Sequence, residues 1–115
     1  MQDRYFYQQE SETFTFLRVP KALFDNPRYK GLSGDCILLY SVMLDRVGLS
    51  RKNHWTDKQG RLYIYFTIEE IIGTFGHARE KAVRLLSQLC DYGLVEKKRQ
   101  GQGKPNILYP KKFDC

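Results

Sequence analysis

The chain has 115 residues, of which 42% are hydrophobic and 14% aromatic, so it can fold as one ordinary domain with its own core. This composition excludes an intrinsically disordered chain. The formal net charge of +6 is concentrated in residues 77–115, which carry nine Lys or Arg against four Asp or Glu, whereas residues 1–76 carry ten against nine. Such a basic region attracts polyanions, although charge alone is equally compatible with a solvated surface.

The cysteines and histidines do not indicate a metal site or a disulfide framework. Cys36, Cys90 and Cys115 are odd in number and lack the spacing of zinc ligands, and neither His54 nor His77 has a partner at ligand spacing. No N-terminal apolar run resembles a signal peptide, and no stretch approaches the length of a membrane span. We therefore expect a cytoplasmic protein without a metal, a cofactor or a membrane partner.

The N-terminal part predicts an arm, followed by one domain over residues 13–115. Residues 1–12 are polar apart from the aromatic triplet Tyr5-Phe6-Tyr7, and we interpret them as an arm that is flexible or docks on a partner. Residues 13–19 alternate and are rich in β-formers, which predicts a short strand. Residues 20–24 then favour one helical turn before an Asn-Pro break.

A long helix is predicted to begin after Ser33, a good N-cap, with Asp35 favourably placed in its first turn. Apolar side chains occur nearly all round this helix, which is typical of a helix buried in the middle of a small domain. Gly48 is predicted to end it, leaving residues 50–53 as a basic loop. Residues 54–66 contain two β-rich runs around a connection that ends in glycine, which predicts an additional β-hairpin.

Two helices separated by a tight turn are predicted next. Thr67 and Glu70 form a capping-box pattern for a short helix over residues 68–75, and Gly76 favours a turn. Apolar residues at helical spacing predict a second helix over about residues 78–92. This order of short helix, turn and longer helix is the helix-turn-helix arrangement.

The last part of the chain predicts a β-wing. Residues 94–99 and 107–109 have the pattern of strands joined by a loop with two glycines, and Pro110 suits the end of an edge strand. The sequence therefore predicts an α+β fold: a winged helix-turn-helix with an N-terminal strand and an additional β-hairpin.

The second helix of a helix-turn-helix enters the major groove of double-stranded DNA and contacts base edges from its N-terminal half. Residues opposite Leu86, placed towards the core, face outward at about 100° per residue, and Arg79 can reach a phosphate along the helix end. The candidate recognition residues are His77, Arg79, Glu80, Lys81, Arg84 and Gln88. Arg84 and Lys81 suit guanine, whereas Glu80 could accept from cytosine or pair with Arg84. A merely solvated helix face is the alternative.

The wing carries basic residues with no acid between Lys97 and Pro110. Its glycines allow the backbone to approach a phosphate or the minor-groove floor closely. The candidate wing contacts are Lys97, Lys98, Arg99, Gln102 and Lys104, and further possible phosphate contacts are Arg51, Lys52 and Thr67. A turn with solubilising lysines is the alternative. No arrangement of carboxylates or of Ser, His and Asp indicates catalysis, so we expect no enzymatic activity.

Much of the chain resembles the RepA N-terminal family, found in replication initiators of Gram-positive plasmids. The resemblance rests on residues 16–35, FLRVPKALFDNPRYKGLSGD, and residues 93–106, GLVEKKRQGQGKPN, with shorter matches in residues 38–67 and 81–86. It implies a domain that binds repeated origin sites (iterons) through its winged helix and forms a homodimer. It also implies a further C-terminal domain, similar to primosomal DnaD proteins, that contacts host replication proteins.

Two features remain open beside the resemblance. Ala78 stands where many helix-turn-helix proteins place Ser or Thr, so the second helix is weakly capped or is capped by His77. The resemblance does not assign His77, Glu80 or Gln88, so the bases that are read stay open. A transcriptional repressor with the same fold, or a protein-interaction module of the replisome, are the alternative functions.

Overall fold

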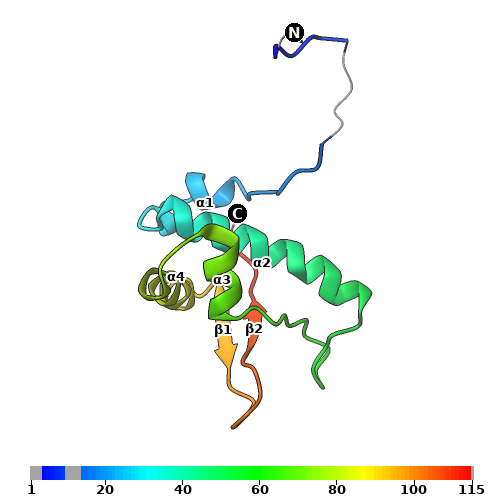
Figure 1. Ribbon diagram of the computed structural model, residues 1–115, viewed down its shortest axis with the longest axis vertical. Helices are drawn as coiled ribbons and strands as arrows, with labels where there is room; N and C mark the ends of the chain where they lie inside the picture. The colour runs from blue at the N-terminus through cyan, green and yellow to red at the C-terminus, as the bar shows by residue number, and fades with distance from the viewer. Residues whose placement is uncertain (1–3, 10–13, 115) are drawn as a thin grey trace.

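The computed structural model describes residues 4–9 and 14–114, which form a helical layer packed on a small sheet (Figure 1). The elements in chain order are α1 (Ala22–Asp25), the 3-10 helix η1 (Pro27–Tyr29), α2 (Gly34–Lys52), α3 (Ile68–Phe75), α4 (Arg79–Asp91), β1 (Val95–Lys98) and β2 (Ile107–Pro110). The predicted α+β winged helix-turn-helix is confirmed, although two of its accessory β elements are not.

The helix-turn-helix follows its local sequence signals. The Thr67 hydroxyl accepts a hydrogen bond from the Glu70 amide at 3.1 Å, and the Glu70 carboxylate accepts from the Thr67 amide at 3.2 Å, which completes the capping box. Gly76 ends α3 with a φ of 71°, a left-handed conformation that favours glycine. The chain can therefore turn sharply into α4.

The long helix α2 begins as predicted but ends later. The Ser33 hydroxyl accepts from the Cys36 amide at 3.2 Å, as a good N-cap does. Gly48 lies inside the helix, which continues to Lys52, so the predicted end and most of the predicted basic loop are wrong. The last turn is anchored by the buried hydroxyl of Ser50, which donates to the carbonyls of Trp55 and Tyr63. These tertiary bonds offset the cost of about 1 kcal/mol for a glycine inside a helix.

The predicted N-terminal strand is absent from residues 14–20, while residue 13 lies outside the described part. A strand needs a partner for its backbone hydrogen bonds, and none of these residues pairs with the sheet. The rings of Phe14 and Phe16 contact each other, with centroids 4.8 Å apart, and both side chains are more than half exposed. Within the predicted arm, residues 4–9 are described and lead away from the body of the domain (Figure 1).

The additional hairpin is reduced to one isolated antiparallel pair, Thr56 with Leu62. Side-chain bonds around Asp57 hold this segment instead of a regular ladder: its carboxylate pairs with Arg61 Nε at 2.8 Å and accepts from the Tyr109 hydroxyl at 3.1 Å. Desolvation opposes ionisation, but the hydrogen bonds from Arg61 and Tyr109 outweigh it and lower the pKa of Asp57 to about 2. The loop is therefore tied to β2.

The sheet consists of β1 and β2, which pair antiparallel with Val95 opposite Pro110 and Lys98 opposite Ile107. Ile64 adds one further rung on the other side of β2, because its amide and carbonyl exchange hydrogen bonds with Leu108 at 2.8 and 2.9 Å. The segment predicted as the second half of a hairpin thus joins the wing.

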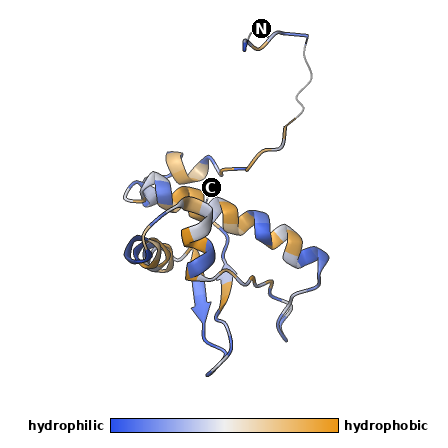
Figure 2. Ribbon diagram, viewed as in Figure 1, coloured by the Kyte–Doolittle hydropathy of each residue, from blue (hydrophilic) through white to orange (hydrophobic). Residues whose placement is uncertain are grey.

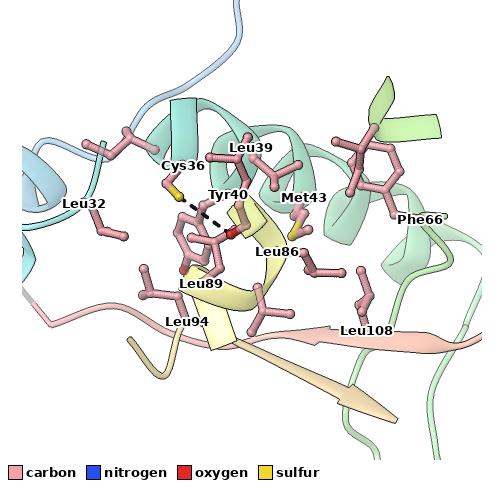
Figure 3. Packing of buried hydrophobic residues seen from close by; sticks show 14 of the residues in the cluster. Leu32, Cys36, Leu39, Tyr40, Met43, Phe66, Leu86, Leu89, Leu94 and Leu108 are labelled. Atoms are coloured by element: carbon pink, nitrogen blue, oxygen red, sulfur yellow. Dashed lines mark hydrogen bonds between the residues drawn. The ribbon is translucent and has the colours of Figure 1, made fainter. Parts of the chain in front are cut away.

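The core lies between α2, α4 and the sheet, as Figure 3 shows. Its largest fully buried side chains are Tyr40, Leu23, Leu39, Met43, Ile64, Ile71, Leu89, Leu94 and Leu108. Burying one such leucine contributes about 1.5–3 kcal/mol, so this cluster fixes α4 against α2. In Figure 2 the apolar colours follow α2 and β2, whereas β1 is hydrophilic. No helix among residues 4–9 and 14–114 is long and apolar enough to cross a membrane.

Candidate nucleic-acid interface

The orientation of α4 follows from its buried stripe. Its buried side chains are Ala82, Leu85, Leu86 and Leu89, and its exposed ones are Arg79, Glu80, Val83, Arg84, Ser87 and Asp91. Val83, one of the apolar residues whose spacing predicted this helix, is 49% exposed, whereas Leu85 is buried. The inward direction of α4 therefore lies between Leu85 and Leu86 rather than at Leu86 itself.

This orientation moves two predicted residues off the outward face. Lys81 Nζ lies 2.7 Å from Asp35 Oδ2, and Gln88 Oε1 accepts a hydrogen bond from the buried Cys36 thiol at 2.8 Å. The hydrogen bond from Lys81 lowers the pKa of Asp35, and burial raises the pKa of Cys36. Lys81 and Gln88 thus lie at the edge of α4 that faces α2, and the outward direction predicted for them is wrong. The predicted helical wheel was centred on Leu86 alone. It is therefore rotated by roughly 50° from the observed inward direction, which is half of the step of about 100° between neighbouring residues.

The start of α4 is held by contacts with α3. The imidazole of His77 stacks on Phe75 with centroids 5.6 Å apart, and its buried Nε2 has no hydrogen-bond partner among the described residues. Ala78 occupies the N-cap without a side-chain cap bond. Arg79 Nη2 lies 2.8 Å from Glu69 Oε1 of α3, and this hydrogen bond lowers the pKa of Glu69. The pairing joins the first turns of the two helices.

Arg84 is the cation at the centre of the exposed face of α4. The pairing considered between Glu80 and Arg84 is not among the five ion pairs of the described residues, and no other of these pairs includes Arg84. Its guanidinium is therefore exposed and available to an external acceptor. Glu80 and Asp91 add acidic groups at the two ends of the same face.

The wing presents its polar side chains to solvent. All five candidate wing residues are exposed: Lys97, Lys98, Arg99, Gln102 and Lys104. The loop between the strands turns at Gly101 and Gly103, whose φ values of 118° and 79° favour glycine. Gln100 Nε2 closes the loop by donating to the Pro105 carbonyl at 2.8 Å. None of the five ion pairs of the described residues involves a wing cation.

A groove of about 600 Å³ separates α4 from the wing, and we call it the α4–wing groove. It is lined by Phe66, Thr67, Ile68, Glu69, Arg79, Val83, Leu86, Ser87, Cys90, Lys97, Lys104, Pro105, Asn106 and Leu108. The fold thus brings Arg79 of the candidate helix face and Lys97 and Lys104 of the wing to one concave surface. The sequence did not identify Val83, Ser87 and Asn106 as part of this surface. The observed burial pattern of α4 places Val83 and Ser87 in the groove, and the conformation of the wing loop places Asn106 there.

The three possible phosphate contacts are separated. Thr67 lines the α4–wing groove, but its hydroxyl is engaged in the capping box with Glu70. Arg51 and Lys52 are exposed at the end of α2, and Arg51 lines a different groove together with Tyr109. Neighbouring strand residues point to opposite faces of a sheet, so the groove beside Tyr109 lies across the wing from the groove beside Leu108. The structure does not bring Arg51 and α4 together.

Among the described residues, no group of three or more His, Cys, Asp or Glu is placed to hold a metal ion.

A helix-turn-helix with a basic β-wing and a concave surface between them defines a winged-helix domain. Residues 15–115 match the family described as replication initiator protein A (RepA) N-terminus, and the chain belongs to this family. The resemblance stated from the sequence is confirmed.

A 41 kDa protein of Lactobacillus helveticus is 38% identical over 98 residues, a match that covers 83% of this chain and 27% of that protein. The chain therefore spans about a quarter of that relative's length. Three solved structures superpose with a TM-score of 0.78. An N-terminal domain of a DNA binding protein is 36% identical, covering 96% of this chain and 85% of that one; a Rep–DNA complex is 36% identical, covering 95% and 84%; an MDR initiator is 31% identical, covering 97% and 88%.

Proposed function

We propose that this domain binds double-stranded DNA sequence-specifically at repeated origin sites, as the first domain of a plasmid replication initiator. The observation that carries the proposal is the α4–wing groove, where Lys97 and Lys104 of the wing, which join none of the ion pairs of the described residues, face α4. Family membership and the likeness to a Rep–DNA complex support the same role.

In the proposed complex, α4 enters the major groove with Arg84 directed at base edges, because this guanidinium is exposed and outside the ion pairs of the described residues. Its fork of donors matches O6 and N7 of guanine. Glu80 can accept from the N4 amino group of cytosine, and its charge repels a phosphate placed there. Asp91 repels the backbone at the other end of the face, which favours insertion by the N-terminal half of α4.

The wing supplies the sequence-independent part of the affinity. Lys97, Lys98, Arg99 and Lys104 are exposed on a hairpin that projects from the body of the domain (Figure 1). Each cation that neutralises a phosphate releases condensed counterions, which makes binding depend on salt. Gly101 and Gly103 lack a Cβ and so allow the wing backbone to approach the sugar-phosphate chain.

The domain is proposed to act by binding alone, without a catalytic step, and as a homodimer that matches paired half-sites. Because the chain spans about a quarter of its 41 kDa relative, contact with host replication proteins is assigned to a further domain of the initiator.

Selection of bound duplexes from a random library tests the proposal. We expect an enriched motif with a guanine whose identity is relaxed in the Arg84→Ala variant, and the motif is expected to occur as repeats in the replication origin of the parent plasmid. Competition with a scrambled duplex at physiological salt supplies the control. If the scrambled duplex binds as tightly as the best site, sequence-specific recognition is refuted.

A further inference from the structure

A second groove, of about 690 Å³, lies between α2 and the end of β2, and we call it the α2–β2 groove. It is lined by Tyr40, Leu44, Val47, Arg51, Arg61, Leu62, Glu96, Tyr109, Pro110, Lys111, Lys112 and Phe113. Glu96 and Tyr109 are paired across the hairpin and face this groove, whereas the next pair, Lys97 and Leu108, faces the α4–wing groove. The two grooves therefore lie on opposite faces of the wing.

The floor of the α2–β2 groove is apolar and held in place. The rings of Tyr40 and Phe113 meet edge to face with centroids 6.3 Å apart, and Leu44 and Val47 of α2 continue the surface. The Tyr40 hydroxyl donates to the Lys111 carbonyl at 2.5 Å, which holds the segment after β2 against α2. Such a preformed apolar surface binds apolar or aromatic side chains with little loss of conformational entropy.

The rim of this groove is cationic. Arg51, Lys111 and Lys112 are exposed, and none of them takes part in the five ion pairs of the described residues. The fourth cation, Arg61, is paired with Asp57 outside the groove lining, and Glu96 is the one acidic residue that lines the groove. An occupant that combines aromatic side chains with negative charge would complement both the floor and the rim.

The N-terminal segment of this same chain has that composition. Phe6 is 86% exposed and Phe16 62% exposed, so the segment presents large apolar side chains to water, which marks an interaction surface when they are grouped. By sequence its first twelve residues contain Asp3, Glu10 and Glu12 against a single basic side chain. In Figure 1 residues 4–9 lead away from the body of the domain, and none of them lines the α2–β2 groove.

We propose that the N-terminal segment of one copy, residues 1–16, docks in the α2–β2 groove of a second copy, and that the exchange is reciprocal. A two-fold dimer buries both segments and both grooves by the same contacts, as closed symmetry requires. This dimer is the homodimer of the proposed function, on which the proposal rests. Because the groove lies across the wing from α4, the exchanged segments leave both DNA-binding surfaces free.

Charge reversal with rescue tests the pairing, with the mass measured by sedimentation or light scattering over a range of concentrations. The native chain is expected to be a dimer, and R51E/K111E/K112E in the groove is expected to raise the dimer dissociation constant at least about tenfold. The complementary change D3K/E10K/E12K in the arm should weaken the native dimer likewise. Combining the two sets should restore it, which a merely unfolded variant would not show.

K97E/K98E/K104E is the matched control, because it reverses the same number of charges across the wing and is expected to leave the dimer intact. A monomeric native chain, or a dimer indifferent to reversal in the groove, overturns the proposal. A monomer whose arm is protected from amide exchange by its own groove also overturns it, because the docking would then be intramolecular. Loss of sequence-specific DNA binding with an intact dimer would instead contradict the proposed function alone.

Discussion

Removing the charge of the wing is expected to weaken DNA binding by an amount that depends on salt. Lys97, Lys98 and Lys104 are exposed and lie outside the ion pairs of the described residues, so each can neutralise one phosphate. Each such contact contributes about −0.9 to the slope of log K against log salt, so replacing all three by serine reduces the magnitude of this slope by about 2.7. If this contribution is taken as zero at about 1 M salt, it corresponds at ~0.1 M salt to a loss of roughly 500-fold in affinity, or about 3.7 kcal/mol.

Fluorescence anisotropy with a labelled duplex, titrated at several salt concentrations, measures this slope. The matched control replaces Arg18, Lys21 and Lys30 by serine, because these cations are exposed near α1, at the far end of the domain from the wing in Figure 1. It removes the same formal charge and is expected to leave the slope nearly unchanged. Equal slopes in the two variants would show that net charge, and not the wing, governs binding, and would refute the reasoning.

Three further changes have expected outcomes. Arg84→Ala should cost about 1–3 kcal/mol at the preferred site and relax specificity at one base, measured by competition between single-base variants of the duplex. Thr67→Ala should lower the free energy of unfolding by about 0.5–2 kcal/mol in urea titrations, because it removes the cap that the Glu70 amide uses. Asp57 has a folded-state pKa of about 2, below its ordinary 3.8, so its ionised form stabilises the fold. That stabilisation is present above pH 3.8 and is lost as the pH falls towards 2, so Asp57→Asn should flatten the decline of the melting temperature in this window.

Each of these variants has its own control. Lys21→Ala, which removes an exposed cation next to α1 instead of one on α4, should leave the base preference at the Arg84 position unchanged. An unfolding free energy of Thr67→Ser equal to that of Thr67→Ala would argue against the hydroxyl cap. Asp25→Asn is the control for the acid dependence, because Asp25 is exposed and outside the ion pairs of the described residues. The melting temperature of this variant should fall at low pH in the same way as that of the native chain. If the melting temperature of Asp57→Asn falls at low pH as steeply as that of the native chain, the stabilising role of ionised Asp57 is contradicted.

Local signals predicted the helix-turn-helix well, because caps and glycine turns act within a few residues. The capping box at Thr67 and the left-handed Gly76 lie where the sequence places them, and α3 has the predicted bounds. The wing strands were also predicted, because two short strand-like runs flank a loop with two glycines, which is typical of a hairpin. These features position α4 next to the wing and therefore define the candidate interface.

Long-range contacts decided what the local pattern could not. The segment before Pro20 has a β pattern but no partner strand, so its residues 14–19 form no strand. Helix α2 passes through Gly48 because Ser50 is bonded to the following loop, a contact that helix-ending rules do not include. The hairpin around Asp57 is replaced by side-chain bonds to Arg61 and Tyr109, and Tyr109 is distant in the sequence.

The sequence by itself determined the order of the main helices and of the two wing strands, the basic wing and the family, because these depend on residue types and their spacing. Only the tertiary structure decided the rotation of α4 about its axis. The sequence pattern does not show which direction of the helix faces the core until the packing of Leu85 and Leu86 is known. That rotation turns Lys81 towards Asp35 and leaves Arg84 exposed on the outward face of α4. The groove between α2 and β2 likewise exists only in the fold, because its floor joins side chains from helix, strand and C-terminal segment.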